Sequence, residues 1–120
     1  MRTTSTLLSA VGLTAQLSAA AYTLQDDYSL SSFFDRFTFY TGTDPTAGFV
    51  DYVDETTAAA NGLVNASSSS VYMGVDHTNV ASSSGRQSVR IASDTTYNHG
   101  LFILDLAHMP GGICGTWPAL

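Results

Sequence analysis

Turn residues interrupt this 120-residue chain about every 8–12 residues and divide it into short β-prone runs. The runs expected to form strands are 37–40, 49–53, 71–75, 88–93 and 99–106, and the alanine-rich stretch 56–61 is expected to form a helical turn. No part of this region carries a strong apolar period of 3.6 residues. Short strands at this spacing indicate an all-β sandwich or barrel. We expect one such domain over residues 21–120.

The first 20 residues have a different composition. Met1-Arg2 provides a positive charge, the following run up to Ala20 is apolar or small, and Ser18-Ala19-Ala20-Ala21 offers small residues for cleavage. This order predicts a secretory signal peptide over residues 1–20 and a secreted, extracellular protein. The run is shorter and more polar than a membrane-spanning helix of about 20 apolar residues. An ordinary N-terminal helix is the alternative.

The charge of the chain excludes several classes of partner. It has no lysine and a net charge of −6, and only 12% of its residues are charged. Nucleic-acid binding needs a basic surface, and anionic membranes attract basic segments. We therefore predict no nucleic-acid partner and no membrane partner, and we expect a monomer. The composition suits a neutral ligand such as a glycan, or simply a Ser/Thr-rich extracellular β protein.

Two residues carry features typical of extracellular proteins, a possible disulfide and a possible glycosylation site. Cys114 is the single cysteine of the chain. In an oxidising compartment this indicates either a disulfide whose second cysteine is missing from the sequence or a free reactive thiol. The alternative is a buried free cysteine that packs as a small apolar group. Asn65-Ala66-Ser67 is an N-glycosylation acceptor, which predicts that Asn65 lies in a surface loop.

Several motifs together resemble those of the fungal endo-1,3(4)-β-glucanases of glycoside hydrolase family 16, the laminarinases. They lie, in order, within 21–28, 33–39, 44–54, 85–91 (G-R-Q-S-V-R-I) and 108–119 (H-M-P-G-G-I-C-G-T-W-P-A). The resemblance implies a concanavalin-A-like β-jelly-roll sandwich, of which this chain would be the N-terminal portion. It implies retaining hydrolysis of β-1,3 or β-1,3-1,4 glucans, with a β-glucan polysaccharide as the partner and no cofactor. It also implies that Cys114 pairs with a cysteine further along.

Three residues are candidate sugar contacts. In a strand over 88–93, Arg90 shares a face with Ser88, opposite apolar neighbours, and its five donors suit sugar hydroxyls. The resemblance implies that Arg90 binds a glucosyl unit on the non-reducing side of the cleavage point, and that Trp117 lines the subsite beside the scissile bond. Tyr52 is a further cleft candidate. The alternatives are an Arg90 that braces a neighbouring strand or acid, and a Trp117 that belongs to the core.

The acids do not form a catalytic pair. Retaining glycosidases need two carboxyl groups about 5–5.5 Å apart, which the family supplies with a strand of sequence E-x-D-x-x-E. This chain has one glutamate, Glu55, and Asp54 would point to the opposite face of an extended chain. Asp26 and Asp27 are also consecutive and would point to opposite faces, and Asp105 has no other acid near it in the sequence. We name no catalytic residue and expect no hydrolysis by this chain.

The remaining hypotheses concern metals and the class of protein. The three histidines lack the spacing of a zinc site, so we predict no metal ligand; they are His77, His99 and His108. A non-catalytic glycan-binding or cell-surface β-sandwich module is the alternative to a truncated glucanase, because one fold serves both functions.

Overall fold

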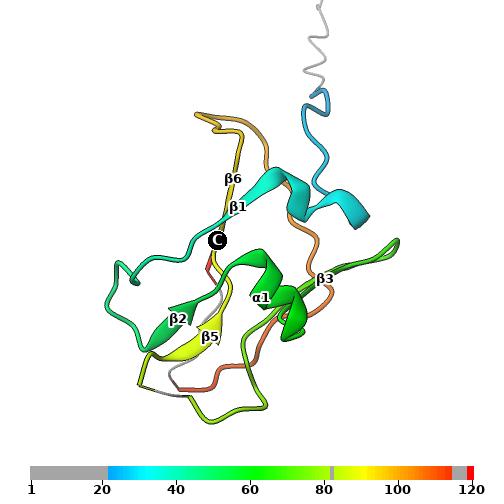
Figure 1. The fold of residues 1–120 in the computed structure, drawn as a ribbon. Helices are drawn as coiled ribbons and strands as arrows, with labels where there is room; N and C mark the ends of the chain where they lie inside the picture. The colour runs from blue at the N-terminus through cyan, green and yellow to red at the C-terminus, as the bar shows by residue number, and fades with distance from the viewer. Residues whose placement is uncertain (1–21, 82, 115–118) are drawn as a thin grey trace, which may run out of the picture.

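The computed structural model of this chain describes residues 22–81, 83–114 and 119–120 (Figure 1). The predicted signal peptide at 1–20 and Trp117 lie outside these residues. Nine short elements follow in the described part, in this order: the 3-10 helices η1 (Leu30–Ser32) and η2 (Phe34–Arg36), the strands β1 (Phe37–Phe39) and β2 (Val50–Tyr52), the helix α1 (Glu55–Ala60), and the strands β3 (Val64–Ala66), β4 (Val71–Met73), β5 (Arg86–Ser88) and β6 (Ile91–Ser93).

The described strands form three two-stranded sheets. β1 pairs with β6 antiparallel, β2 pairs with β5 parallel, and β3 and β4 form an antiparallel hairpin. The strands predicted at 37–40, 49–53 and 71–75 are present with narrower bounds, and the predicted helical turn is α1. The chain is therefore predominantly β, as its turn spacing predicts. No helix in the described ranges is long and apolar enough to cross a membrane.

The single strand predicted over 88–93 is wrong, because the chain changes partner in the middle of it. Val53 N–H donates to the Ser88 carbonyl at 3.2 Å, whereas Tyr40 N–H donates to the Arg90 carbonyl at 2.9 Å. The segment thus leaves β2 at the end of β5 and joins β1 as β6. Ser88 is buried and does not share the exposure of Arg90.

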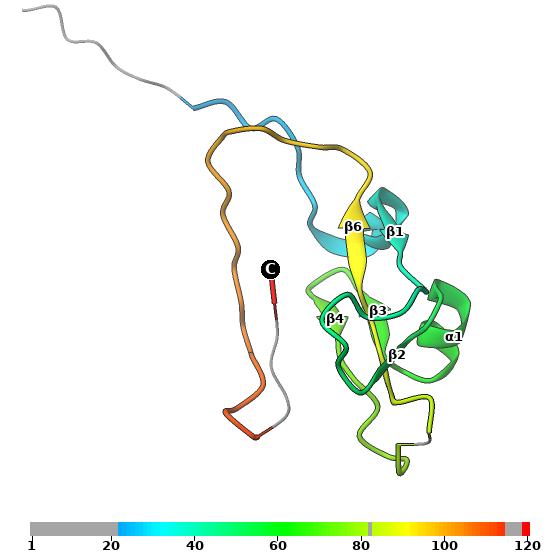
Figure 2. The ribbon, with the colours of Figure 1, turned by 90° about the vertical axis from the view of Figure 1, so that its left-hand side faces the viewer.

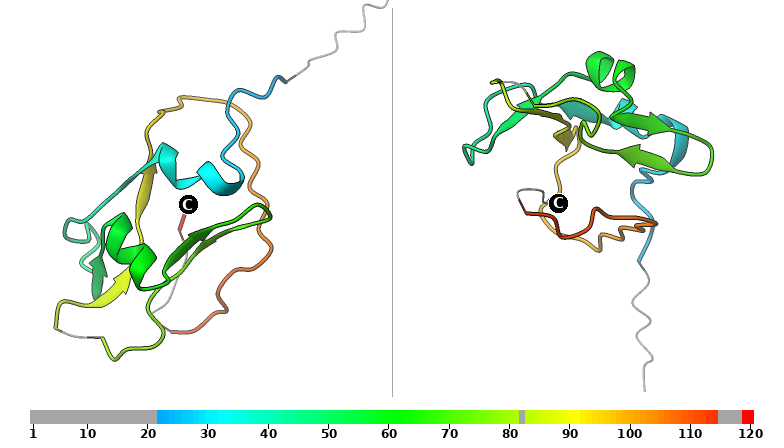
Figure 3. Two further views of the ribbon diagram at one scale, coloured as in Figure 1. Left: turned by 45° about the vertical axis from the view of Figure 1, so that its right-hand side comes forward. Right: turned by 90° about the horizontal axis from the view of Figure 1, so that it is seen from below.

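The strand predicted over 99–106 is also wrong. Residues 99–106 run as extended chain, apart from the three sheets (Figures 2 and 3). Leu101, Phe102 and Ile103 are 61%, 66% and 85% exposed. A strand needs a neighbour that accepts and donates its backbone hydrogen bonds, and the described residues supply none for this segment. The apolar run is thus β-prone but unpaired.

The core lies beneath α1. Its buried apolar side chains are Phe34, Val53, Ala58, Leu63 and Val64. Ala58 is fully buried because α1 turns this face toward the strands. The Asp54 carboxylate begins the helix by accepting the Thr57 N–H at 2.7 Å, which is the usual N-cap bond.

Gly85 sets the contact between β2 and β5. Its φ of +111° is disfavoured for residues with a side chain, and a Cβ there would lie 2.6 Å from the backbone of Val50. The glycine of the G-R-Q-S-V-R-I motif therefore lets β5 approach β2 closely.

Candidate functional site

Arg90 lies at the centre of an aromatic cluster. Its guanidinium carbon is 5.2 Å from the ring centre of Tyr40 and 5.8 Å from that of Tyr52. The two rings meet edge to face, with centroids 5.8 Å apart and planes at 71°. The Arg90 Nη1 atom is 3.8 Å from Asp44 Oδ1, and 46% of the Arg90 side chain is exposed. We call Arg90, Tyr40, Tyr52 and Asp44 the Arg90 cluster.

The strands bring these side chains together. Tyr40 follows β1, Tyr52 ends β2, and Arg90 occupies the junction of β5 and β6. Since β5 runs beside β2 and β6 beside β1, the junction faces both tyrosines. The break in the predicted strand is therefore what places Arg90 between two rings.

Asp44 is held by its own loop. Its carboxylate accepts the Thr46 hydroxyl at 2.6 Å and the Gly48 N–H at 2.8 Å. These bonds, with a smaller contribution from the Arg90 charge, hold the pKa of Asp44 below its ordinary value. Its side chain is only 7% exposed. Asp44 thus presents a fixed negative charge to one side of Arg90.

The Arg90 cluster has the chemistry of a carbohydrate site. A guanidinium has five donors in a plane, and Asp44 approaches only part of it. Tyrosine rings offer flat apolar faces and hydroxyl tips, which match the two kinds of surface on a pyranose. Within the described ranges no three metal-binding side chains gather.

The structure brings together two of the three predicted contacts. Arg90 and Tyr52 share the cluster, and Trp117 lies outside the described residues. Tyr40 and Asp44 were missed. Asp44 lies in a stretch that the family resemblance covers, but no pattern in the sequence ties either residue to Arg90. The alternative reading of Arg90 also has support, because Arg90 does contact an acid.

The two predicted extracellular features are both exposed. The Cys114 thiol is free. Asn65 is exposed as predicted, but it lies in β3 rather than in a loop. The sequon reaches the loop only at Ser67.

Two carboxylates outside the cluster accept backbone N–H groups of their own segments. Asp54 caps α1, and the Thr57 N–H holds the pKa of Asp54 below its ordinary value. Asp76 accepts the Thr78 and Asn79 N–H groups at 2.9 and 3.1 Å, which lower its pKa strongly. Arg86 Nη1 donates to the Asp76 carbonyl at 2.6 Å. These contacts assign structural roles to Asp54 and Asp76.

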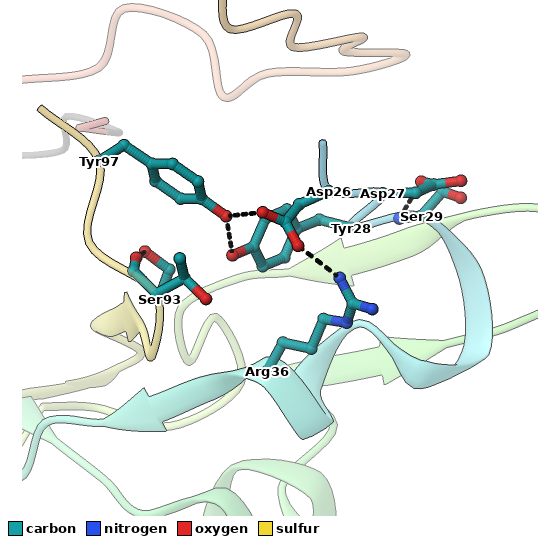
Figure 4. Close-up of polar contacts among 8 residues, drawn as sticks. Asp26, Asp27, Tyr28, Ser29, Arg36, Ser93 and Tyr97 are labelled. Carbon is teal, nitrogen blue, oxygen red and sulfur yellow. Dashed lines mark hydrogen bonds and ion pairs between the residues drawn. The ribbon is translucent and has the colours of Figure 1, made fainter. Parts of the chain in front are cut away.

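A second group with an arginine, tyrosines and an acid joins the start of the described chain to the segment after β6 (Figure 4). Tyr97 donates its hydroxyl to Asp26 Oδ2 at 2.6 Å and shares a 2.7 Å bond with the Tyr28 hydroxyl. Arg36 Nη1 is 3.6 Å from Asp26 Oδ1, and its guanidinium carbon is 5.4 Å from the Tyr28 ring centre. The bond to Asp26, and then that to Tyr28, raises the pKa of Tyr97. We call this group the N-terminal clasp.

Comparison with known protein families identifies a family that this chain matches. Residues 37–120 match the family described as XgeA-like, catalytic GH16 domain.

Relatives and solved structures agree with that match. The chain is 49% identical to an endo-1,3(4)-beta-glucanase of Arthroderma benhamiae, over 99% of this chain and 26% of the relative. It is 45% identical to the endo-1,3(4)-beta-glucanase xgeA of Emericella nidulans, over 84% of this chain and 17% of the relative. The chain therefore spans about a quarter or less of the length of these curated relatives.

Two solved structures have a similar fold. An elongating GH family 16 beta-1,3-glucosyltransferase matches with a TM-score of 0.63 and 49% identity, over 67% of this chain and 28% of that one. Laminarinase 16A from Phanerochaete chrysosporium, with 6-O-glucosyl-laminaritriose in its donor and acceptor sites, matches with a TM-score of 0.58 and 45% identity, over 62% and 26%. The fold is thus part of the β-jelly-roll sandwich expected from the sequence.

Proposed function

Because this chain belongs to the XgeA-like catalytic domains of glycoside hydrolase family 16, we propose that it forms one wall of the cleft of an endo-1,3(4)-β-glucanase. The polysaccharide is a β-1,3 or mixed β-1,3-1,4 glucan, as the names of the relatives support. Within this wall the Arg90 cluster binds a glucosyl unit, and Trp117 lines the neighbouring subsite.

The observation that carries this proposal is the position of the Arg90 guanidinium over two tyrosine rings. The guanidinium carbon lies 5.2 Å from the ring centre of Tyr40 and 5.8 Å from that of Tyr52. With 46% of the Arg90 side chain exposed, its outer donors are accessible to sugar hydroxyls. The Asp44 carboxylate fixes the orientation of the group before a ligand arrives.

Titration with laminari-oligosaccharides tests the proposal. We expect Arg90→Lys to weaken binding about tenfold, because a point charge does not reproduce the planar donor set. Arg36→Lys is a matched control. Arg36 is equally exposed at 47% and also lies beside an acid and over a tyrosine ring, but in the N-terminal clasp.

The two variants distinguish an Arg90 that binds sugar from an Arg90 that only holds its loop in place. If Arg90 only braces its loop, Arg90→Lys and Arg36→Lys will both leave the affinity unchanged. An equal loss of affinity in both variants would indicate a general loss of stability. Only a loss confined to Arg90→Lys supports the sugar site.

This chain binds glucan without cleaving it. In the family mechanism one carboxylate attacks the anomeric carbon and another donates a proton to the leaving oxygen. Here the single glutamate, Glu55, occupies the first turn of α1 and Asp54 caps the same helix. Hydrolysis of laminarin or lichenan by the purified chain, above the background of a catalytically inactive full-length glucanase, would refute this statement.

The composition of the N-terminal residues is that of a secreted protein. We propose that residues 1–20 direct the chain to the secretory pathway and that the protein acts outside the cell. Mass spectrometry of the chain recovered from culture medium should find an N-terminus after Ala20 or Ala21. An uncleaved Met1 in secreted material would contradict this.

A further inference from the structure

The outer face of the β3–β4 hairpin holds the N-glycosylation sequon. Val64 is buried and Ala66 packs on the core, so the alternation of β3 turns Asn65 outward. The register places Asn65 directly opposite Tyr72 of β4. Side chains directly opposite each other have Cβ atoms about 4.5–5.5 Å apart, so the side chains of Asn65 and Tyr72 start next to each other.

A hollow opens beside this pair. Its volume is about 310 Å³, and its lining includes Ala59 of α1, Gly62, Ser70 and both Asn65 and Tyr72. This volume is at the lower limit of about 300–1,000 Å³ for ligand pockets, which suits one monosaccharide. The hollow is lined by apolar, hydroxyl and amide groups. The elements that supply much of this lining, α1, β3 and β4, are labelled in Figure 2.

Tyr72 provides a platform within the hollow. A Cβ at Gly74 would collide with the Tyr72 hydroxyl, so the phenol ring lies over the bare backbone of Gly74. Tyr72 remains 45% exposed. A flat, partly exposed aromatic ring is suited to stacking against a pyranose.

We propose that Asn65 carries an N-linked glycan whose first N-acetylglucosamine lies in this hollow against the ring of Tyr72. The donor is an oligosaccharide linked to a polyprenyl diphosphate. The Nδ2–C1 bond forms, the bond from C1 to the diphosphate oxygen breaks, the diphosphate leaves with the electron pair, and Nδ2 loses one proton. Glycosylation of Asn65 requires that the chain enters the secretory pathway, as the proposed function also does. It requires no other part of the proposed function.

The order of events follows from Ser67. In the hairpin its hydroxyl oxygen accepts the Ser69 and Ser70 N–H groups at 3.2 and 3.0 Å and lies 3.0 Å from the Ser70 carbonyl, to which it donates. The hydroxyl of the sequon is therefore already bonded in the folded chain. Attachment precedes closure of the hairpin, and the sugar then enters the hollow as β3 and β4 pair.

The test uses the chain secreted by a yeast host that adds high-mannose glycans. An endoglycosidase that cuts after the first N-acetylglucosamine leaves one sugar on Asn65, and peptide mass spectrometry measures its occupancy. We expect the trimmed chain to melt roughly 4 °C above Asn65→Gln, which is the size of shift that one modest added contact produces in a small domain.

Tyr72→Thr is the decisive variant. It keeps the sequon and removes the ring, so the rise in melting temperature from the single sugar should disappear. Tyr22→Thr is the control, because Tyr22 is 80% exposed at the start of the described chain and should leave the rise intact.

Three results would overturn the proposal. They are an unmodified Asn65 in the secreted chain, a single-sugar form that melts with Asn65→Gln, and a rise that persists in Tyr72→Thr. None of these measurements depends on glucan binding, so failure here is distinguishable from failure of the proposed function.

Discussion

Replacement of Gly85 by alanine tests the central packing contact of this fold. The new Cβ would lie 2.6 Å from two backbone atoms of Val50, at a φ of +111°. Backbone atoms cannot rotate away as the end of a side chain can, so β5 has to move from β2. We expect the cost to appear both in stability and in local protection of the β2–β5 pair.

The magnitude follows from three contributions. Backbone strain at a disfavoured φ costs about 1–3 kcal/mol, and a forced shift in a packed region costs about 1–3 kcal/mol. Reduced freedom of the unfolded chain offsets about 0.4–1 kcal/mol. The free energy of unfolding should therefore fall by about 3 kcal/mol, which lowers the melting temperature by roughly 15 °C.

Gly62→Ala is the matched control. Gly62 also has a positive φ, of +69°, but a Cβ there meets nothing within 4 Å. Alanine at this position carries the backbone strain alone and should cost about 1 kcal/mol. The two variants therefore differ by the collision with Val50.

Chemical denaturation and amide exchange measure the difference. Arg86 N–H donates to the Phe49 carbonyl at 3.2 Å, so its exchange should accelerate in Gly85→Ala and remain slow in Gly62→Ala. Equal losses of stability in the two variants, or an unchanged Arg86 amide, would refute the argument that β5 needs glycine to approach β2.

Three further results are expected. Tyr97→Phe removes the hydroxyl that bonds Asp26, so limited proteolysis before η1 should accelerate while laminari-oligosaccharide affinity stays unchanged; slower or equal cleavage would contradict the N-terminal clasp. Leu63→Ala should cost about 3 kcal/mol in urea unfolding because Leu63 is 2% exposed, whereas Val80→Ala, at a site 97% exposed, should cost under about 0.5 kcal/mol. The pKa of Asp44 is lowered on folding, so the stability that its carboxylate contributes is complete above the ordinary pKa of 3.8 and is lost as the pH falls through the folded pKa. Between about pH 5 and about pH 2, a range that extends roughly one to two units on either side of the ordinary pKa, Asp44→Asn should therefore lose less stability than the unmodified chain. Parallel profiles of stability against pH would refute this.

The sequence predicts local structure well where neighbours along the chain decide it. The alanine-rich stretch 56–61 predicts the helical turn that the structure shows as α1. The prediction of one strand over 88–93 is wrong because this segment pairs first with β2 and then with β1, which lie far from it in sequence. The prediction of a strand over 99–106 is wrong because residues with high β propensity form a strand only where a partner strand is present.

The same distinction explains the site. Alternation along the chain identifies Arg90 as a residue opposite apolar neighbours, and this is a local property. The Arg90 cluster also needs Tyr40 and Asp44, which are joined to Arg90 only by the pairing of β1 with β6. No spacing in the sequence records that contact.

The two arginine groups of this chain show why composition alone does not identify a sugar site. Both Arg36 and Arg90 combine an acid, a tyrosine ring and about half-exposed side chains. In the N-terminal clasp the acid also accepts the hydroxyl of Tyr97, so the group joins two distant segments. In the Arg90 cluster the Asp44 carboxylate bonds within its own loop, and its approach to Arg90 leaves other guanidinium donors accessible. The difference lies in what each acid is bonded to, and it makes Arg90 rather than Arg36 the residue whose loss should weaken glucan binding.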